Sequence, residues 1–326
     1  MLRVAPLVLL AACREPLPID APPPPPRDAA TLVDVTADVV MARDARRVRV
    51  ATFNVHRYFD TVCDSGNCNP GDFEEVASPT EFARRTNELA SAIERLDVDV
   101  ALLQEVETEG CLRALKDRLG GAFPVAVMGE IGTPASVDVA VLARDRLIET
   151  RTHRRQPITR PDGTTTVFSR EFLEVHLQRG ARRVVVFSAH FRSMVNDDPG
   201  RRIAEAQTAR AIVTATAREF PDALVVLGGD LNDDPMSPTI NALEEGGALV
   251  RVARELAPPA NITWSGFSGG RVFDHIFLAA DATGGSYVTG TAVVLRDATS
   301  GGTSAAGYGG SDHGAVRADF TLRASD

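Results

Sequence analysis

From about residue 47 to residue 323 the chain alternates apolar strand-like segments with amphipathic helical ones, and this pattern restricts the fold most strongly. Helical spacing of apolar residues follows Ser78 and Asp198, two typical N-cap residues, and Leu112, Leu115 and Leu119 predict a shorter helix between them. The predicted strands are 48–55, 98–103, 138–143, 167–177, 183–191, 224–227, 272–278, 287–295 and 315–322. Without an internal repeat or a second linker, the pattern predicts one α/β domain with at least eight strands.

Polar side chains capable of binding metal or moving protons recur at the ends of these strands. They are Asn54, Glu105, His190, Asp230 with Asn232, Asp274, and Asp312 with His313. A single residue of this kind is usually a turn former or a helix cap. Six such positions on one chain instead predict a shared site. The Asp274 carboxylate lies inside an apolar strand, so it must be paired with another group or bind a metal.

The residue types at these positions indicate the chemistry of the site. Glu105, together with amide and carboxylate groups, would suit a hard divalent cation, Mg²⁺ above all, with Mn²⁺ or Ca²⁺ as alternatives. His190 and His313 would supply two groups for proton transfer near neutral pH. Metal, base and acid together predict hydrolysis of a phosphate ester.

Charge and cysteine content exclude several other classes of protein. The 326 residues carry a net charge of −9, which argues against binding through a broad basic surface. A phosphate substrate remains compatible, because bound metal offsets acidic residues locally. No apolar run reaches the length of a membrane span, and four cysteines are too few for a disulfide scaffold.

The ordered motifs resemble the endonuclease/exonuclease/phosphatase superfamily, in its deoxyribonuclease I-like form. They are Thr52-Phe53-Asn54-Val55, Leu103-Gln104-Glu105, Ser188-Ala189-His190-Phe191, Gly229-Asp230-Leu231-Asn232, Phe273-Asp274-His275-Ile276 and Ser311-Asp312-His313. The resemblance implies an α/β (α+β) fold, a four-layer sandwich of two packed mixed β-sheets flanked by helices. It also implies metal-dependent cleavage of phosphodiesters or phosphomonoesters.

The resemblance assigns the metal-binding and acid/base roles by motif. Glu105 would be the principal metal ligand, with Asn54 beside it and Asp312 sharing the ion. His313, hydrogen-bonded to Asp274, would form one member of the acid/base pair, because a carboxylate behind an imidazole fixes its tautomer and raises its pKa.

Further residues complete the site implied by the resemblance. His190 would be the second acid/base group, and Asp138 is a candidate for orienting it. Asp230 and Asn232 would orient the water or the phosphate, in the catalytic set with the two histidines and Asp274. Arg170 and Arg192 are candidates for contacting the substrate phosphate, with a solvated strand arginine as the alternative for Arg170.

The first 46 residues have the pattern of an export signal followed by a membrane anchor and a spacer. Residues 1–12 predict a short signal peptide, and Leu10-Ala11-Ala12-Cys13 resembles a bacterial lipobox that would make Cys13 the lipidation site. Residues 13–46 would form a Pro-rich spacer before a domain at 47–326. We therefore expect export and lipid anchoring in the bacterial cell envelope, at the outer membrane or cell surface. A short N-terminal helix or a different start codon is the alternative.

Three features of the remaining loops stay open. Cys63 and Cys68 flank a turn and can close a small disulfide, but Cys111 can pair with either of them. The segment Asp60 to Glu75 is rich in acidic residues and could hold a structural Ca²⁺, although it lacks EF-hand spacing. The Gly/Ser-rich segment 299–311 is either a lid or a flexible connection.

Three functions are compatible with these features. The leading hypothesis is an exported nuclease that cleaves DNA, so nucleic acid would be its partner, with no protein partner and a monomeric state. The Ser-Ala-His-Phe motif at His190 disfavours the apurinic endonuclease branch, which carries a tyrosine motif there, and is similar to deoxyribonuclease I-like, sphingomyelinase-like and phosphoinositide-phosphatase-like members. Residues 54–60 resemble predicted bacterial extracellular nucleases except at His56. The alternative is a phosphatase or a sphingomyelinase/phospholipase C-like hydrolase of lipid headgroups. A second alternative is a non-catalytic surface-binding lipoprotein.

Overall fold

The computed structural model describes residues 44–266, 270–297 and 307–324. The expected signal peptide, Cys13 and nearly all of the Pro-rich spacer lie outside these residues, as does most of the 299–311 segment. Arg43–Asp326 form one compact unit. Among the described residues, no helix combines the length and the apolar character needed to cross a membrane.

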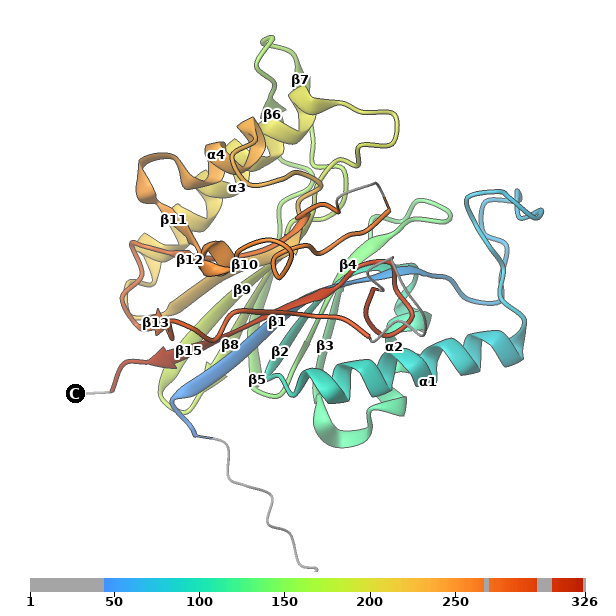
Figure 1. Cartoon of the computed structure of the whole chain (residues 1–326), viewed down its shortest axis with the longest axis horizontal. Coiled ribbons are helices and arrows are strands. Elements are labelled where there is room, and N and C mark those ends of the chain that lie inside the picture. Colours follow the sequence, from blue (N-terminus) through green and yellow to red (C-terminus); the bar gives the residue numbers. More distant parts are fainter. Residues whose placement is uncertain (1–43, 267–269, 298–306, 325–326) are drawn as a thin grey trace, which may run out of the picture. The chain divides into compact units, whose positions relative to one another are not determined.

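Two large mixed β-sheets form the centre of this unit (Figure 1). The seven-stranded sheet has the order β13 (Gly285–Tyr287), β15 (Ala315–Leu322), β1 (Arg47–Tyr58), β2 (Val100–Val106), β4 (Asp138–Ala143), β3 (Val125–Gly129), with β14 (Val293–Leu295) also paired to β15. The six-stranded sheet has the order β11 (Leu249–Arg251), β12 (Asp274–Ala279), β10 (Leu224–Asp230), β9 (Arg182–His190), β8 (Leu173–Arg179), β5 (Arg146–Thr152). A separate hairpin joins β6 (Ile158–Thr159) and β7 (Thr165–Thr166).

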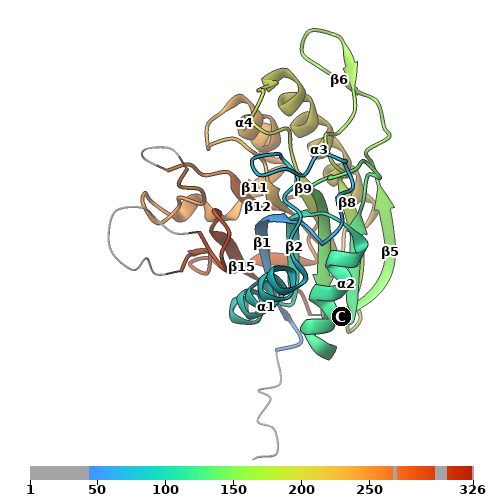
Figure 2. The same ribbon diagram turned by 90° about the vertical axis from the view of Figure 1, so that its right-hand side faces the viewer.

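In the part of the chain that the structure describes, four α-helices cover the outer faces of the two sheets (Figure 2). They are α1 (Pro79–Leu96) and α2 (Glu109–Arg118) on the seven-stranded sheet, and α3 (Pro199–Glu219) and α4 (Pro238–Glu244) on the six-stranded sheet. Short 3₁₀ turns occupy Gly120–Ala122, Glu245–Gly247 and Val252–Glu255. The predicted four-layer sandwich of helix, sheet, sheet and helix is therefore confirmed.

The sequence signals for helix starts are present in the structure. Ser78 accepts a hydrogen bond from the Glu81 amide, and Glu81 accepts one from the Ser78 amide, which completes a capping box at α1. Asp198 likewise caps α3 through the Arg201 amide. Thr108 caps α2 by accepting from the Cys111 amide. These bonds satisfy helix N–H groups that have no partner within the helix.

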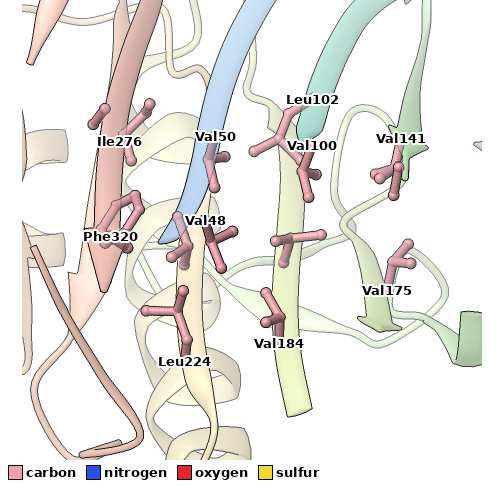
Figure 3. Close-up of a cluster of buried hydrophobic side chains, with 14 of the residues drawn as sticks. Val48, Val50, Val100, Leu102, Val141, Val175, Val184, Leu224, Ile276 and Phe320 are labelled. Carbon is pink, nitrogen blue, oxygen red and sulfur yellow. The ribbon is translucent and has the colours of Figure 1, made fainter. Parts of the chain in front are cut away.

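Alternation along β1 determines which layer each side chain enters. Val48 and Val50 point into the core between the sheets, whereas Ala51 and Phe53 join the cluster under α1 and α2. In Figure 3, Val48 and Val50 face the second sheet, which contributes Val184 and Leu224 among others. Burying these apolar side chains supplies the main driving force for bringing the two sheets together.

The core between the sheets becomes polar toward one end of the sandwich. On the inward faces of β1, β2, β9 and β10, an apolar side chain is followed toward this end by small or polar residues. These are Thr52 and Asn54 after Val50, Gln104 after Leu102, Ser188 and His190 after Val186, and Gly228 and Asp230 after Val226. Gln104 links the sheets, because it accepts from Thr52 Oγ1 at 3.1 Å and donates to Ser188 Oγ at 3.4 Å. Since β1–β2 and β9–β10 are parallel pairs, their carboxyl ends meet at this edge.

Two predicted strands differ from the structure for identifiable reasons. The strand expected over 167–177 begins only at Leu173, because the Ser169 amide and hydroxyl donate to the Glu205 carboxylate instead of to a neighbouring strand. The strand expected over 287–295 is split into β13 and β14 by a turn at Gly290, whose φ is 83°. Strands β3, β5, β6, β7 and β11 and helix α4 were not predicted, since their short or polar segments show little periodicity.

A buried carboxylate in β8 provides a test of the fold. Glu174 accepts from the rings of His176 at 2.6 Å and His153 at 2.7 Å, and from Thr216 of α3 at 3.2 Å. Although burial opposes ionisation, the bonds from His153 and His176 lower the pKa of Glu174 from 4.5 to about 2. Its contribution to stability is thus present above pH 4.5 and is lost as the pH falls toward 2.

Glu174→Gln should therefore lower the free energy of unfolding by ~3 kcal/mol at pH 7, because it removes one partner of a buried charge network. Urea denaturation at pH 7 and at pH 3 measures this, and the gap to wild type should be narrower at pH 3. Glu149→Gln, at a half-exposed carboxylate in β5, should change stability by less than about 0.5 kcal/mol. Equal effects of the two substitutions would contradict the role of Glu174.

Candidate active site

Backbone irregularities at the ends of β1 and β2 expose Glu105. The pairing register shifts between Asn54 and Tyr58 and again between Gln104 and Val106. His56, Arg57 and Glu105 have φ values of 52°, 46° and 66°, in the left-handed region that side chains rarely adopt. Strain of this kind persists where the surrounding structure enforces it, commonly at functional sites. As a result the Glu105 carboxylate lines an open pocket while its two neighbours in β2 are buried.

Asn54 connects the two sheets at the site. Its Nδ2 donates to Glu105 Oε1 at 3.1 Å and to Asp230 Oδ2 at 2.9 Å, and its Oδ1 accepts from the His56 amide at 2.9 Å. The sequence placed Asn54 beside Glu105 as a metal ligand. In the structure its amide nitrogen bridges the two carboxylates and its oxygen accepts from the backbone, while its role as a metal ligand stays a prediction.

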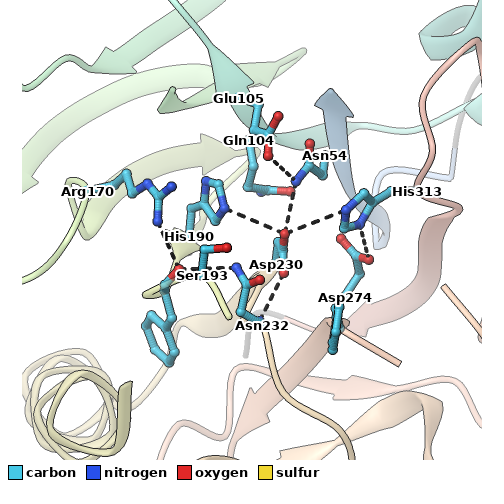
Figure 4. A network of polar contacts seen from close by, with 12 residues as sticks. Asn54, Gln104, Glu105, Arg170, His190, Ser193, Asp230, Asn232, Asp274 and His313 are labelled. Carbon is cyan, nitrogen blue, oxygen red and sulfur yellow. Dashed lines mark hydrogen bonds and ion pairs between the residues drawn. The ribbon is translucent and has the colours of Figure 1, made fainter. Parts of the chain in front are cut away.

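Asp230 lies between the two predicted acid/base groups (Figure 4). Its Oδ2 is 3.6 Å from His190 Nε2 and 3.9 Å from His313 Nε2. Figure 4 shows the two imidazoles on opposite sides of this carboxylate. The expected hydrogen bond between His313 and Asp274 is present, with 2.8 Å between Nδ1 and Oδ2. A reacting group held near Asp230 would therefore have one histidine on each side.

The pKa values of the two histidines are shifted in opposite directions. Burial, with the positive charges of Arg170 and His313, holds the pKa of His190 well below 6.5. Burial also disfavours the charged form of His313, but Asp274, Asp230 and Asp312 raise its pKa to about 10. At neutral pH His190 is thus ready to accept a proton, and His313 is ready to donate one.

The donor groups at the centre of the site fit a divalent cation. Glu105, His190 and Asp230 each offer one ligand atom, and these atoms lie within 4.8 Å of one another. Carboxylate oxygens are the ligands that Mg²⁺, Ca²⁺ and Mn²⁺ prefer. Glu105 faces the pocket and Asp230 is buried. An ion bound between these two carboxylates would therefore enter from the solvent-filled pocket and contact a buried carboxylate on its inner side.

Asp312 lies farther out than its predicted role as a shared metal ligand suggests. Its Oδ2 accepts from Trp264 Nε1 at 2.9 Å, and its Oδ1 is 3.8 Å from His56 Nδ1. Its side chain is 43% exposed, and its carboxylate is outside the close group formed by Glu105, His190 and Asp230. The structure therefore places Asp312 on the rim of the pocket, where it contributes negative charge beside His313.

Asn232 and Asp138 hold the backbone around the site. The Asn232 amide donates to Asp230 Oδ1 at 2.9 Å, and its Nδ2 donates to the Phe191 carbonyl at 3.2 Å. Asp138 accepts from Ser136 Oγ at 2.7 Å and from the Ile131 amide at 3.1 Å. No hydrogen bond joins Asp138 to His190 in the described residues, so the expected orienting contact is absent.

Arg170 and Arg192 both line the pocket, which has a volume of about 560 Å³. Buried Glu205 of α3 secures both segments, because it accepts from the Ser169 amide at 2.6 Å and the Arg192 amide at 2.7 Å. Arg170 also donates to the Phe191 carbonyl at 3.1 Å. The backbone segments that carry Arg170 and Arg192 are thus held beside the pocket by a carboxylate that does not itself line it.

Arg170→Gln should reduce kcat/KM for a phosphate ester by ~10- to 100-fold, because a charge-assisted hydrogen bond contributes about 1.5–3 kcal/mol. Most of the loss should appear as a raised KM if the guanidinium binds substrate and transition state alike. Steady-state kinetics on bis-p-nitrophenyl phosphate measure this, with Arg118→Gln on α2 as a remote control. An unchanged kcat/KM would show that Arg170 serves the fold alone.

Several pocket residues were not predicted from the sequence. They are His56, Arg57, Phe73, Trp264, Phe273 and the segment 193–196. Trp264 stacks on Phe273, with 5.4 Å between ring centroids, and forms a backbone bridge to His313. It is the single tryptophan of the chain, a signal that could have been used, whereas Phe73 and segment 193–196 lie in loops without a recognisable pattern.

Comparison with known structures confirms the fold. A TDP2 structure from C. elegans has a TM-score of 0.59 at 17% identity, covering 85% of this chain and 75% of that chain. A Bacteroides thetaiotaomicron endonuclease/exonuclease/phosphatase family protein has a TM-score of 0.60 at 17% identity, covering 86% and 99%. A mannosyl-6-phosphatase from B. thetaiotaomicron has a TM-score of 0.59 at 17% identity, covering 84% and 100%. No curated protein matches the sequence.

The family comparison covers the whole of the site. The model of the endonuclease/exonuclease/phosphatase family matches residues 51–313, which extend from the strand bearing Asn54 to His313. Enzymes of this family depend on divalent metal ions, in agreement with the donor set around Glu105 and Asp230. The chain belongs to the endonuclease/exonuclease/phosphatase family and is a hydrolase of phosphate esters.

Proposed function

We propose that the protein is an exported, divalent-metal-dependent phosphodiesterase that cleaves DNA. The observation that carries this proposal is the placement of His190 and His313 on opposite sides of Asp230, next to Glu105. In-line displacement at phosphorus needs proton transfer on two sides, at the attacking water and at the leaving oxygen. A site with one group on each side supports that geometry.

The residues of the site take distinct roles in this reaction. Neutral His190 accepts the proton of the attacking water, and charged His313, held by Asp274, donates a proton to the leaving oxygen. Arg170 and Arg192 bind the non-bridging phosphate oxygens from the pocket wall. A divalent cation held by Glu105 and Asp230 would neutralise charge that develops on the phosphate. Asn54 and Asn232 keep Asp230 in place throughout.

The pocket wall supports a nucleic acid as the substrate. Phe73, Trp264 and Arg57 are among the residues that line it. Nucleobases stack on aromatic rings, and arginine provides both charge and a planar surface, so this combination suits a single-stranded or locally opened strand. A related fold, D. rerio TDP2, has been solved in complex with a single-strand DNA product.

Two observations support export. The N-terminal residues have the pattern of a signal peptide, a lipobox cysteine at Cys13 and a Pro-rich spacer. The pair Cys63–Cys68 forms a disulfide, and Cys111 is free and buried, which resolves the pairing left open by the sequence. Disulfides persist mainly outside the reducing cytoplasm. We infer that the enzyme is tethered by lipid to the bacterial cell envelope, at the outer membrane or cell surface.

Hydrolysis of a phosphorylated sugar or lipid headgroup is the second candidate function. It is favoured by the mannosyl-6-phosphatase of the same fold and by an apolar pocket mouth, where Phe73 is 52% and Val195 is 73% exposed. Such side chains would suit contact with a lipid surface. The non-catalytic alternative is set aside, since the chain belongs to a hydrolase family and its site groups are assembled.

A substrate panel distinguishes these functions. The full chain is assayed on plasmid DNA, bis-p-nitrophenyl phosphate, sphingomyelin and inositol phosphates, in Mg²⁺, Mn²⁺ or Ca²⁺ and in EDTA. The proposal expects metal-dependent cleavage of DNA that is fastest in Mg²⁺ and is lost in the double variant His190→Ala/His313→Ala. Turnover of a lipid headgroup or inositol phosphate with intact plasmid would replace the nuclease proposal by the second candidate.

A further inference from the structure

Three potential metal ligands lie together in a place that the catalytic residues do not use. Asp60 follows β1, Glu107 follows β2, and Cys111 lies in the first turn of α2. One oxygen from each acid and the Cys111 Sγ lie within 4.8 Å of one another. Because β1 and β2 are parallel neighbours, the segments after them leave the sheet at the same edge.

Glu107 carries an oxygen that has no partner. The residue is 2% exposed, and its Oε2 accepts from the Asp60 amide at 2.7 Å. Its Oε1 is buried and makes no hydrogen bond to any described residue. A buried carboxylate oxygen in this state is costly unless a proton or a cation occupies the position beside it. This observation is independent of the clustering and points to a ligand that the protein atoms do not supply.

The surroundings of this cluster are negatively charged. The carboxylates of Asp60, Asp64 and Glu74 all act electrostatically on Glu107. The nearby guanidinium of Arg57 is directed elsewhere, to Glu75. A positive ion would offset this accumulation of charge at short range, where the Coulomb interaction of buried groups is strong.

We propose that Asp60, Glu107 and Cys111 bind a zinc-class divalent cation, separate from the catalytic ion. Zn²⁺ accepts cysteine thiolates and carboxylate oxygens as ligands, usually in a four-coordinate site, and water can complete the set at partly exposed Asp60. A thiolate ligand selects this class of ion against Ca²⁺ and Mg²⁺. The site also differs from the Ca²⁺ loop expected over 60–75, whose Glu74 carboxylate is engaged by the Asp64 and Ser65 amides.

The cation would anchor one wall of the active-site pocket. Asp60 is preceded by Phe59, whose ring contacts Phe73 at 5.8 Å between centroids, and Phe73 lines the pocket. The guanidinium of Arg57 lies over the Phe73 ring, 4.8 Å from its centroid. Tying Asp60 to α2 thus restrains the segment that presents Phe73 to the substrate.

Cobalt(II) provides the test, because thiolate ligation gives a charge-transfer absorption band that carboxylates and imidazoles do not produce. The full chain, kept without reductant so that Cys63–Cys68 stays closed, is titrated with Co²⁺. We expect a thiolate band that saturates at one ion per chain, is abolished by stoichiometric Zn²⁺ and persists in a hundredfold excess of Ca²⁺. Cys111→Ser should remove the band, and Glu107→Gln should weaken Co²⁺ binding by at least tenfold.

Matched variants keep this result interpretable. Glu105→Gln removes the catalytic ligand and should keep the band, and Glu109→Gln alters an exposed carboxylate of the same helix turn and should also keep it. Circular dichroism verifies that each variant is folded. Absence of the band in the wild type, or an unchanged band in folded Glu107→Gln, would overturn the proposal. Because absorption is the readout, the result does not depend on the proposed DNA cleavage.

Discussion

Glu105→Gln is expected to lower kcat/KM for a phosphodiester by ~10³-fold. The substitution keeps the shape of the side chain and an oxygen that can accept from Asn54, but it removes the anionic charge. A catalytic cation contributes several kcal/mol of transition-state stabilisation, and each 1.36 kcal/mol corresponds to a factor of ten in rate. The measurement is a steady-state assay on bis-p-nitrophenyl phosphate at increasing Mg²⁺.

The Mg²⁺ dependence separates a ligand from a structural residue. If Glu105 holds the ion, the variant should need much more Mg²⁺ for half-maximal activity while its thermal midpoint stays near that of the wild type. Glu109→Gln serves as the control, since this carboxylate is exposed and does not line the active-site pocket. A Glu105→Gln enzyme within tenfold of wild-type kcat/KM at moderate Mg²⁺ would contradict the assignment.

Asp274→Asn should reduce kcat by ~10²-fold at pH 8, with a smaller loss at pH 6. Asp274 accepts the hydrogen bond from His313 Nδ1 and is a main reason that the pKa of His313 rises to about 10. A raised pKa keeps the imidazole protonated until the pH approaches 10. Without the carboxylate the pKa falls back toward 6.5, so the proton donor is lost between pH 6.5 and pH 10.

The pH profile of kcat distinguishes proton donation from general damage. The wild-type rate should stay high well above pH 8, whereas that of Asp274→Asn should decline as the pH rises through about 7. Asp281→Asn, at a surface carboxylate paired with Arg218, should leave the profile unchanged. Parallel profiles for Asp274→Asn and wild type would mean that His313 does not act as the acid.

Much of the sandwich could be predicted from the sequence because its buried strands are apolar on both faces. Strands β2, β9 and β10 begin and end near their predicted limits, and capping residues at α1 and α3 define where those helices start. Strand β5 was missed because most of its residues are polar and none is fully buried, and its pairing comes from the neighbouring strand β8. Segment 167–172 was predicted to be part of a strand. Nothing in the local sequence reveals that the carboxylate of Glu205, more than 30 residues away, accepts the hydrogen bond of the Ser169 amide.

The candidate site was predictable where chemistry and strand position coincide. Glu105, His190 and Asp230 lie at the ends of buried strands, and His313 lies just before the last strand. The structure brings these four side chains together across two sheets. Orientation was not predictable, since the amide of Asn54 is fixed by contacts from both sheets and Asp312 is drawn to Trp264. The unpartnered oxygen of Glu107 becomes visible only once α2 and the segment after β1 are in place.

Plasmid cleavage by the full chain and by His190→Ala/His313→Ala, compared in Mg²⁺ and in EDTA, tests the central claim most directly. The account predicts that the wild-type chain converts supercoiled DNA to nicked and linear forms in Mg²⁺. It predicts no cleavage in EDTA and at least a hundredfold slower cleavage by the folded double variant. Equal cleavage by wild type and double variant, or intact plasmid with every divalent ion supplied, would contradict it.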